Sequence, residues 1–125
     1  MPITMTALTS SALTLNLTAY SSNSIAPTAN NLVLATVLVT QSSTALVPAL
    51  SGNGLTWVQV GSGIVNDGAD TLLTLFRSMG GTPTSGLVTI DLASRVHSGC
   101  AWSFAEFASV DTTGTNGSGA VVQSN

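Results

Sequence analysis

Hydrophobic and polar residues alternate with a period of two along several short stretches of this chain. In Leu87-Val-Thr-Ile-Asp-Leu92, the side chains of Val88, Ile90 and Leu92 share one face, and Asp91 lies on the other. Successive side chains of a β-strand point to opposite faces, so this alternation predicts a half-buried strand with Asp91 in water. No stretch carries apolar residues at helical spacing over more than two turns, and we therefore expect little or no helix.

Short runs rich in Thr, Val, Leu and Ile are separated throughout by clusters of Gly, Pro, Asn, Asp and Ser. The runs predict strands near residues 3–8, 12–20, 31–40, 55–61, 71–79, 87–92, 99–107 and 119–123. Such spacing is typical of antiparallel sandwiches and jelly rolls. We therefore expect a single all-β domain over residues 1–125, an antiparallel β-sandwich that is jelly-roll-like. Within it, residues 1–11 are expected to include an N-terminal arm, and the Gly/Thr/Ser-rich residues 111–125 a turn and a C-terminal arm or strand.

Two of the predicted strands are apolar on both faces. The segment 32–39 contains one polar residue, a threonine. In the segment 71–79, Leu73 aligns with Arg77, while Leu72 and Phe76 occupy the opposite face. Strands of this kind belong at the centre of a sandwich or beneath another subunit. We expect either a covered outer face or a sheet edge that a neighbouring copy completes.

Composition strengthens the expectation of assembly. The chain is 44% apolar and only 6% charged, against roughly a quarter in ordinary globular proteins. Arg77 and Arg95 are its only permanent cations, and its net charge is −3. A surface of uncharged Ser and Thr has little electrostatic repulsion to keep copies apart, which favours a homo-oligomer. Nucleic acid is not expected as a partner, because two Arg cannot neutralise a row of phosphates.

Neither a membrane span nor an export signal is predicted. The longest apolar run, residues 32–39, is much shorter than the ~20 residues of a spanning helix. The start Met1-Pro-Ile-Thr4 has neither the basic nor the apolar segment of a signal peptide. We expect a soluble protein that is made in the cytoplasm and has no membrane partner.

Residue types that support catalysis are few. His97 is the only histidine, and its neighbour Ser98 would point to the opposite face of a strand, so a loop histidine within 93–99 is expected. Paired-carboxylate chemistry would need Glu106 opposite Asp91 or Asp111. Asp111 precedes Thr-Thr-Gly and is typical of a turn, and Asn66-Asp-Gly-Ala-Asp70 is interpreted as a hairpin turn rather than a calcium loop. We expect no catalytic, cofactor or metal site, and no enzymatic activity.

Three residues near the C-terminal end define the sharpest candidate for a ligand site. Trp102, Phe104 and Glu106 share one face of a predicted strand, and together with Trp57 they could stack and bind a sugar or contact a subunit. The simpler interpretation is packing, in which the aromatic rings fill the core and Glu106 ends the strand. Cys100 stands alone, so no disulfide within the chain can form, and it is expected to be a small buried hydrophobic residue.

Several phrases of the sequence resemble a known group of proteins. They are Ile25-Ala-Pro-Thr-Ala-Asn-Asn-Leu-Val-Leu34, Ser51-Gly-Asn-Gly-Leu-Thr-Trp57, Thr74-Leu-Phe-Arg77, Ser85-Gly-Leu-Val-Thr-Ile90 and Ala101-Trp-Ser-Phe-Ala-Glu-Phe107, followed by Val110-Asp-Thr-Thr113. In this order they resemble β-sandwich modules of tailed-phage virion proteins of the decoration or tail type, and of some bacterial surface proteins. The likeness runs from about residue 12 to the end. It implies a structural or adhesive role, with no catalytic residues to carry over.

The resemblance and the composition together favour a non-enzymatic structural protein of a phage virion. A capsid decoration (cement) protein that docks on the major capsid protein and self-associates is the first expectation, since the chain is small and lacks fibrous repeats. The protein would then be located in the virion. The alternatives are a carbohydrate-binding or adhesive β-sandwich module that recognises surface glycans, and a subunit of a tail, fibre or extracellular filament.

Overall fold

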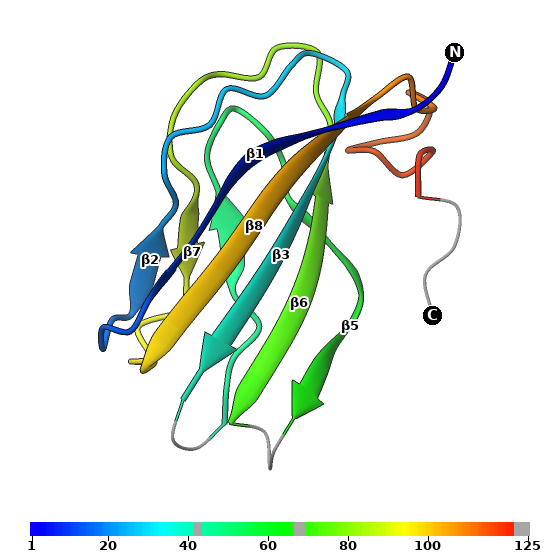
Figure 1. Ribbon diagram of the computed structural model, residues 1–125. Helices are drawn as coiled ribbons and strands as arrows, with labels where there is room; N and C mark the ends of the chain where they lie inside the picture. Colours follow the sequence, from blue (N-terminus) through cyan, green and yellow to red (C-terminus); the bar gives the residue numbers. More distant parts are fainter. Residues whose placement is uncertain (42–43, 67–69, 122–125) are drawn as a thin grey trace.

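The computed structural model describes residues 1–41, 44–66 and 70–121, and these residues contain eight β-strands and no helix. The strands are β1 (Thr4–Leu13), β2 (Ala19–Ser21), β3 (Leu32–Thr40), β4 (Ala49–Ser51), β5 (Val58–Asn66), β6 (Thr71–Ser78), β7 (Thr89–Asp91) and β8 (Gly99–Ala108). They form a five-stranded and a three-stranded antiparallel sheet that face each other (Figure 1). The expected all-β sandwich is confirmed, with no helix in the described residues.

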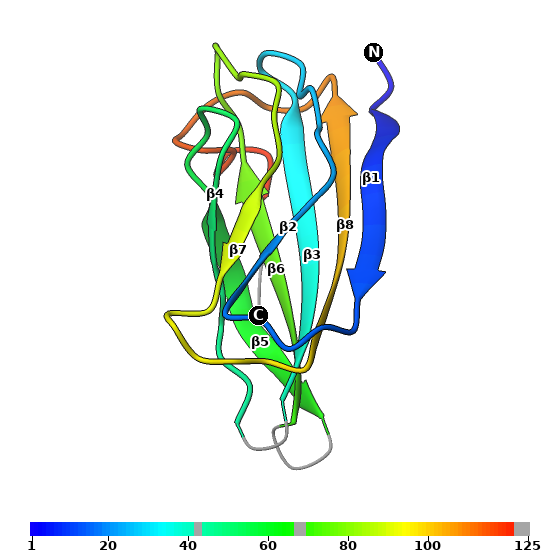
Figure 2. The ribbon, with the colours of Figure 1, turned by 90° about the vertical axis from the view of Figure 1, so that its left-hand side faces the viewer.

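The strands pair in the nested order of a long hairpin rolled onto itself. The first strand pairs with the last, the second with the seventh and the third with the sixth. The larger sheet has the order β1-β8-β3-β6-β5, and the smaller has the order β2-β7-β4 (Figure 2). The fourth nested pair would be β4 with β5. It is reduced to a bridge between Gly52 and Leu55, because β5 lies beside β6 at the edge of the larger sheet. This topology is jelly-roll-like, as expected.

The core lies between the two sheets and is built from the inward residues of both. The larger sheet contributes the alternate residues of β3, β6 and β8, and the smaller sheet contributes Tyr20 and Ile90. The predicted alternation in 87–92 is confirmed: Val88, Ile90 and Leu92 are 0% exposed, whereas Asp91 is exposed. Leu72 and Phe76, which were predicted to share the face opposite Arg77, both point inward.

The N-terminal part of the chain differs from the prediction. Residues 4–13 form one strand where two strands, near 3–8 and 12–20, were predicted, and β1 is the edge of the larger sheet. The pairing of β1 with β8 shifts between Ala7 and Thr9, so Leu8 is an extra residue that breaks the period of two. The predicted strand over 12–20 is not continuous either, because β1 ends at Leu13 and β2 begins at Ala19.

Two further differences concern short or irregular segments. β4 lies in a stretch predicted to be a break. The strand was missed because its three residues are too few to show a pattern. Residues 119–121, predicted to begin a strand, are in turn or irregular conformation. The rest of that predicted strand, and the centre of the turn predicted at Asn66–Asp70, lie outside the described residues.

His97 lies in the predicted loop but is fully buried, which the sequence did not indicate. The amide of Leu46 donates to its Nε2 at 3.1 Å, and its Nδ1 is 3.1 Å from the carbonyl of Arg95. Since Nε2 accepts, the ring proton is on Nδ1 and is donated to Arg95. The hydroxyl of Tyr20 also donates to the carbonyls of Leu15 and His97. The imidazole thus ties the 44–48 segment to the turn between β7 and β8.

We predict that His97→Leu destabilises the protein by about 1–3 kcal/mol, because the partly buried amide of Leu46 loses its acceptor. The melting temperature should fall by roughly 5–10 °C in thermal unfolding monitored by circular dichroism. His97→Gln is the matched control, since its Oε1 can accept from the same amide, and it should lose less. An equal loss in both variants would mean that ring packing, not the hydrogen bond, stabilises this region.

Candidate functional site on the outer face of the larger sheet

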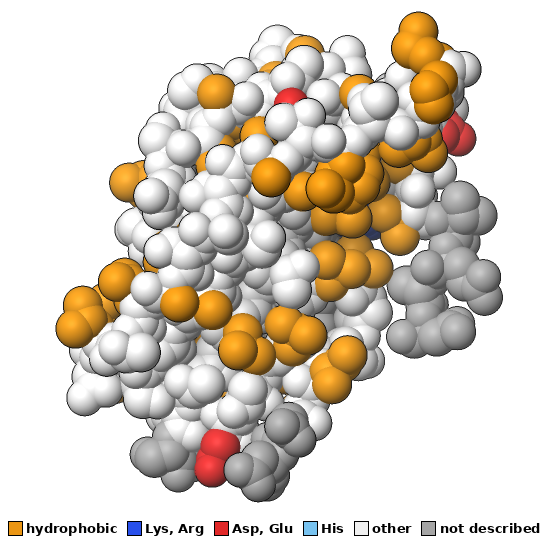
Figure 3. Space-filling view, viewed as in Figure 1, with side chains coloured by type: hydrophobic (Ala, Val, Ile, Leu, Met, Phe, Trp, Pro, Cys, Tyr) orange, Lys and Arg blue, Asp and Glu red, His pale blue; other side chains and the backbone are white. Residues whose placement is uncertain are grey.

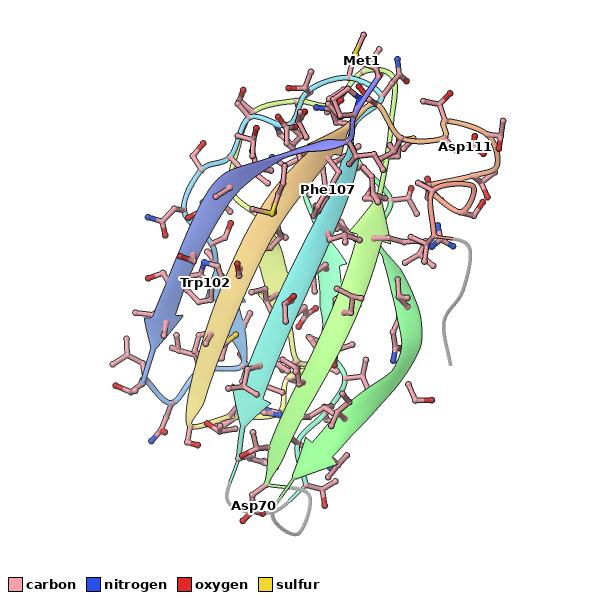
Figure 4. All side chains as sticks on the ribbon, turned by 45° about the vertical axis from the view of Figure 1, so that its right-hand side comes forward. Met1, Asp70, Trp102, Phe107 and Asp111 are labelled. Carbon is pink, nitrogen blue, oxygen red and sulfur yellow. The ribbon has the colours of Figure 1, made fainter. Side chains whose placement is uncertain are left out.

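The outward side chains of the five-stranded sheet form regular rows across the strands. The register places four such rows side by side (Figure 4). They are Met5–Phe107–Leu32, Ala7–Ala105–Leu34–Arg77–Val58, Ser10–Ser103–Thr36–Leu75–Val60 and Ala12–Ala101–Leu38–Leu73–Ile64. The last row is apolar on all five strands. We define the outer face as the side chains that point outward in these rows. They belong to residues 5–12, 32–38, 58–64, 73–77 and 101–107.

This face is unusual for a sheet side turned to water, because it is mainly apolar. Antiparallel sheets with one solvated side normally carry polar residues there. Here Met5 is 64% and Ile64 67% exposed, and the leucines between them are half-buried. Figure 3 shows hydrophobic side chains gathered in bands across this side of the molecule, with uncharged polar atoms between them. The two-faced apolar character predicted for β3 and β6 is present.

In three of its four rows the outer face has large side chains on one half and small ones on the other; the row of Met5 and Phe107 is the exception. On β3 and β6 the rows contain Leu34, Leu38, Leu73 and Leu75, whereas on β1 and β8 the corresponding positions are Ala or Ser. The small residues leave two shallow hollows. One of about 180 Å³ lies between Leu38, Leu73 and Ser103, and one of about 150 Å³ lies over Ala12 and Gly99. Leu38 and Ala101 line both, so the hollows adjoin.

Charge is almost absent from the outer face. Of its described side chains only Arg77 is charged, and its Nη1 donates to the carbonyls of Thr115 at 3.0 Å and Asn116 at 2.6 Å. These bonds hold the C-terminal segment 110–121, which we call the arm, at one corner of the face (Figure 4). Gly117 of the arm has φ +82°, and a Cβ there would lie 2.6 Å from Leu32 Cδ1. Glycine therefore allows the arm to cover that end of the sheet.

The residues predicted as a ligand or subunit contact do share a face, but it is the inner one. Trp102 and Phe104 are 4% and 0% exposed, and Trp102 Nε1 has no hydrogen-bond partner among the described residues. Trp57 is half-buried, packs edge-to-face on Phe104 with ring centroids 5.6 Å apart, and donates to the carbonyl of Gly52. The rings of Trp102 and Phe104 are thus core residues in this structure and offer no stacking face to a sugar. The pattern predicted their common side, but not that the side faces inward.

Glu106 anchors a loop instead of facing a ligand. Its two carboxylate oxygens accept from the amide of Thr28 at 2.8 Å and from the Thr28 hydroxyl at 2.9 Å. It is 7% exposed. This arrangement fixes the connection between β2 and β3, because both hydrogen bonds join β8 to the middle of that loop.

The carboxylates considered for acid–base chemistry do not share a site with Glu106. Asp91 is exposed on the outer side of the smaller sheet, where it accepts from the amide of Ala93. Asp111 lies in the arm and accepts from the amide of Thr113 at 2.8 Å. Hydrogen bonds from Thr113 lower the pKa of Asp111. Its predicted turn-forming role agrees with this contact.

Cys100 is buried at 4% exposure, as predicted, and burial raises the pKa of its thiol to about 12. We predict that the native thiol reacts very slowly with Ellman's reagent at pH 8, whereas the unfolded chain titrates one thiol. Since the folded pKa lies above the ordinary value of 9.0, the associated stability is complete below pH 9 and is lost as pH rises toward 12. Between pH 9 and 11, the free energy of unfolding measured with denaturant should fall less steeply with pH for Cys100→Ala than for the native protein. Rapid native labelling would contradict the buried position.

We predict that Glu106→Ala lowers the free energy of unfolding by about 2–3 kcal/mol, because the amide and hydroxyl of Thr28 lose charged acceptors. Hydrogen exchange of the Thr28 amide should accelerate together with its neighbours in the loop. Thr28→Val is the matched control, since it removes only the hydroxyl bond and should cost less. Unchanged exchange at Thr28 in Glu106→Ala would show that the carboxylate does not hold the loop.

Comparisons with known proteins add no assignment: no family model, curated protein or solved structure matches the chain. In the described part of the chain, no three His, Cys, Asp or Glu side chains gather in a way that could hold a metal ion. Nor do the described residues include a helix with the length and apolar character needed to cross a membrane. The outer face of the larger sheet is the surface whose chemistry carries the functional argument that follows.

Proposed function

We propose that this chain is a non-enzymatic structural protein of a phage virion, in the first place a capsid decoration protein that docks on a repeating lattice and self-associates. The observation that carries the proposal is the outer face, an apolar and almost uncharged sheet surface on a small jelly-roll-like domain. The order of sequence phrases that resembles phage virion modules directs the proposal to a virion rather than to another assembly.

Burial of this face provides the energy for docking. Each Å² of apolar surface that leaves water contributes about 25 cal/mol, and the rows of Leu, Val, Ile and Met supply such surface, with Arg77 as the one charged side chain among their described residues. The Thr and Ser side chains between them can donate and accept hydrogen bonds at a contact. Repetition over many identical lattice sites would add avidity to a modest single contact.

The positions of the polar residues support a structural over an enzymatic role. Glu106 and His97 are buried, and each is occupied by hydrogen bonds to the backbone of its own chain. Asp91 and Asp111 are exposed in different parts of the molecule, away from the core. Paired general acid–base work needs two such groups that face one substrate, and this arrangement does not supply them.

Virion membership predicts that the chain fractionates with particles. Virus-like particles induced from the source strain would be treated with nuclease, banded on a density gradient and probed with an antibody against the recombinant protein. We expect the chain to band with the particles in many copies and to decorate their surface in immunogold images.

The control is the same gradient run on lysate from a strain that lacks the gene. Recovery of the chain only from the soluble fraction would refute the virion proposal. Binding of the recombinant protein on a glycan array, without particle association, would favour the adhesive alternative.

A further inference from the structure

We infer that the outer face binds a second copy of this chain face to face, around a two-fold axis that runs along the strands near the boundary of β3 and β8. The inference rests on the proposal that this face is an assembly surface, and it adds the partner and the symmetry. The same dimer contact would be present in any larger assembly that contains the dimer.

The first argument is that the face is complementary to itself in shape. Its β3–β6 half projects Leu38 and Leu73, and its β8–β1 half presents Ala101 and Ala12 in the same row. The two adjoining hollows lie where the small residues meet the large ones. One face therefore contains both a ridge and the depression that a ridge can fill.

The second argument is geometric. A two-fold axis that lies in the interface along the strands exchanges the two halves of the face while keeping each row at its own height. Leu38 and Leu73 of one copy then lie over the Ala101 and Ala12 side of the other. An axis across the strands would instead oppose ridge to ridge. The first arrangement is an isologous contact between sheets packed ~10 Å apart with nearly aligned strands.

The third argument concerns charge. A face that meets its own copy meets its own charges, and like charges at a contact are unfavourable. Here the single described charge, Arg77, is one and a half strand spacings from the axis, so the two guanidinium-bearing strands are separated by ~14 Å laterally. Each Arg77 also donates to carbonyls of its own arm. Self-association therefore brings no pair of like charges into contact.

The fourth argument is size. The four strands that face each other across this axis, β1, β8, β3 and β6, at ~4.8 Å spacing and seven residues at ~3.3 Å rise give a flat footprint of roughly 440 Å² per copy. The side-chain relief increases the accessible area above this value, toward the ~800 Å² per partner of standard protein interfaces. This footprint places the dimer at the small end of protein interfaces.

The edges of the larger sheet are less suited to the same partner. β1 carries its bulge at Leu8, and the pairing of β5 with β6 shifts between Val60 and Ile64, where Gly61 has φ +65°. Irregular edge strands are poor templates for strand addition. A second copy therefore finds a more regular surface on the face than at either edge.

Light scattering after size exclusion tests the dimer directly. We expect a mass of twice 12.5 kDa at micromolar concentrations. Leu73→Lys should weaken the dimer at least about tenfold, since it places an unpaired ammonium in each half of the apolar contact. Leu87→Lys is the matched control, because Leu87 is half exposed outside the outer face, and it should leave the mass unchanged. Thermal unfolding of both variants checks that they fold.

A cross-linking experiment tests the position of the axis. Ser103 is exposed at the middle of β8 and pairs with Thr36 at the boundary of β3 and β8. A short bismaleimide should therefore convert Ser103→Cys to covalent dimers. Ser21→Cys replaces an exposed serine on the outer side of the smaller sheet and should give no covalent dimer. The buried native Cys100 should not compete, given its raised pKa.

The outcomes separate this inference from the virion proposal. A monomer at all concentrations, a dimer insensitive to Leu73→Lys, or cross-linking of Ser21→Cys in place of Ser103→Cys would each overturn the face-to-face dimer. None of these results decides whether the chain bands with particles. Conversely, a dimer with the expected sensitivities supports the inference even where the particle gradient shows the chain only in the soluble fraction.

Discussion

The structure depends on the insertion of β8 between β1 and β3. This last strand pairs along nine residues with β3 and along a similar length with the first strand, so it joins the two ends of the described chain. Its inward residues, Trp102 and Phe104, reach the core, and the smaller sheet packs against the same core. Without β8 the larger sheet would divide into a lone β1 and the β3-β6-β5 group. Such non-local pairing makes the fold cooperative, because its central contacts form only when distant segments meet.

The same strand determines the character of the outer face. While its inward positions hold large aromatic rings, its outward positions hold Ala101, Ser103 and Ala105, which are small. The neighbouring β3 has the opposite balance, with Val and Ala inward and Leu34 and Leu38 outward. Volume is thus distributed so that the core is filled from β8 and the outer relief comes from β3 and β6. Close packing of the interior and a ridged outer surface follow from one arrangement of side chains.

The sequence predicted the parts of this structure that local alternation encodes. Val88, Ile90 and Leu92 could be assigned to one face because each strand residue has only two directions available. The fold class followed from the number and spacing of such runs. β1 was split because its bulge at Leu8 reverses the alternation, and β4 was missed because three residues contain no period.

The site could be predicted only in part, for a related reason. The shared face of Trp102, Phe104 and Glu106 is local information, but whether that face is inward depends on pairing with β1 and β3. The buried His97 accepts from the amide of Leu46, which is far away in the sequence. The rows of the outer face likewise exist only through the register of five strands. A pattern within one strand could show that β6 is apolar on both sides, but not which residues would stand beside Leu73.

Two leucines on the same strand show what covering the outer face achieves. Leu32 and Leu38 both point outward from β3, yet Leu32 is only 5% exposed whereas Leu38 remains half-buried. The difference is the arm, which approaches Leu32 at Gly117 and is held by Arg77. Where the chain has a segment within reach, that segment removes the apolar row from water, and the burial outweighs the entropy of ordering the arm. The remaining rows have the same chemistry and no segment of this chain over them in the described residues, so the same driving force acts there on a second molecule.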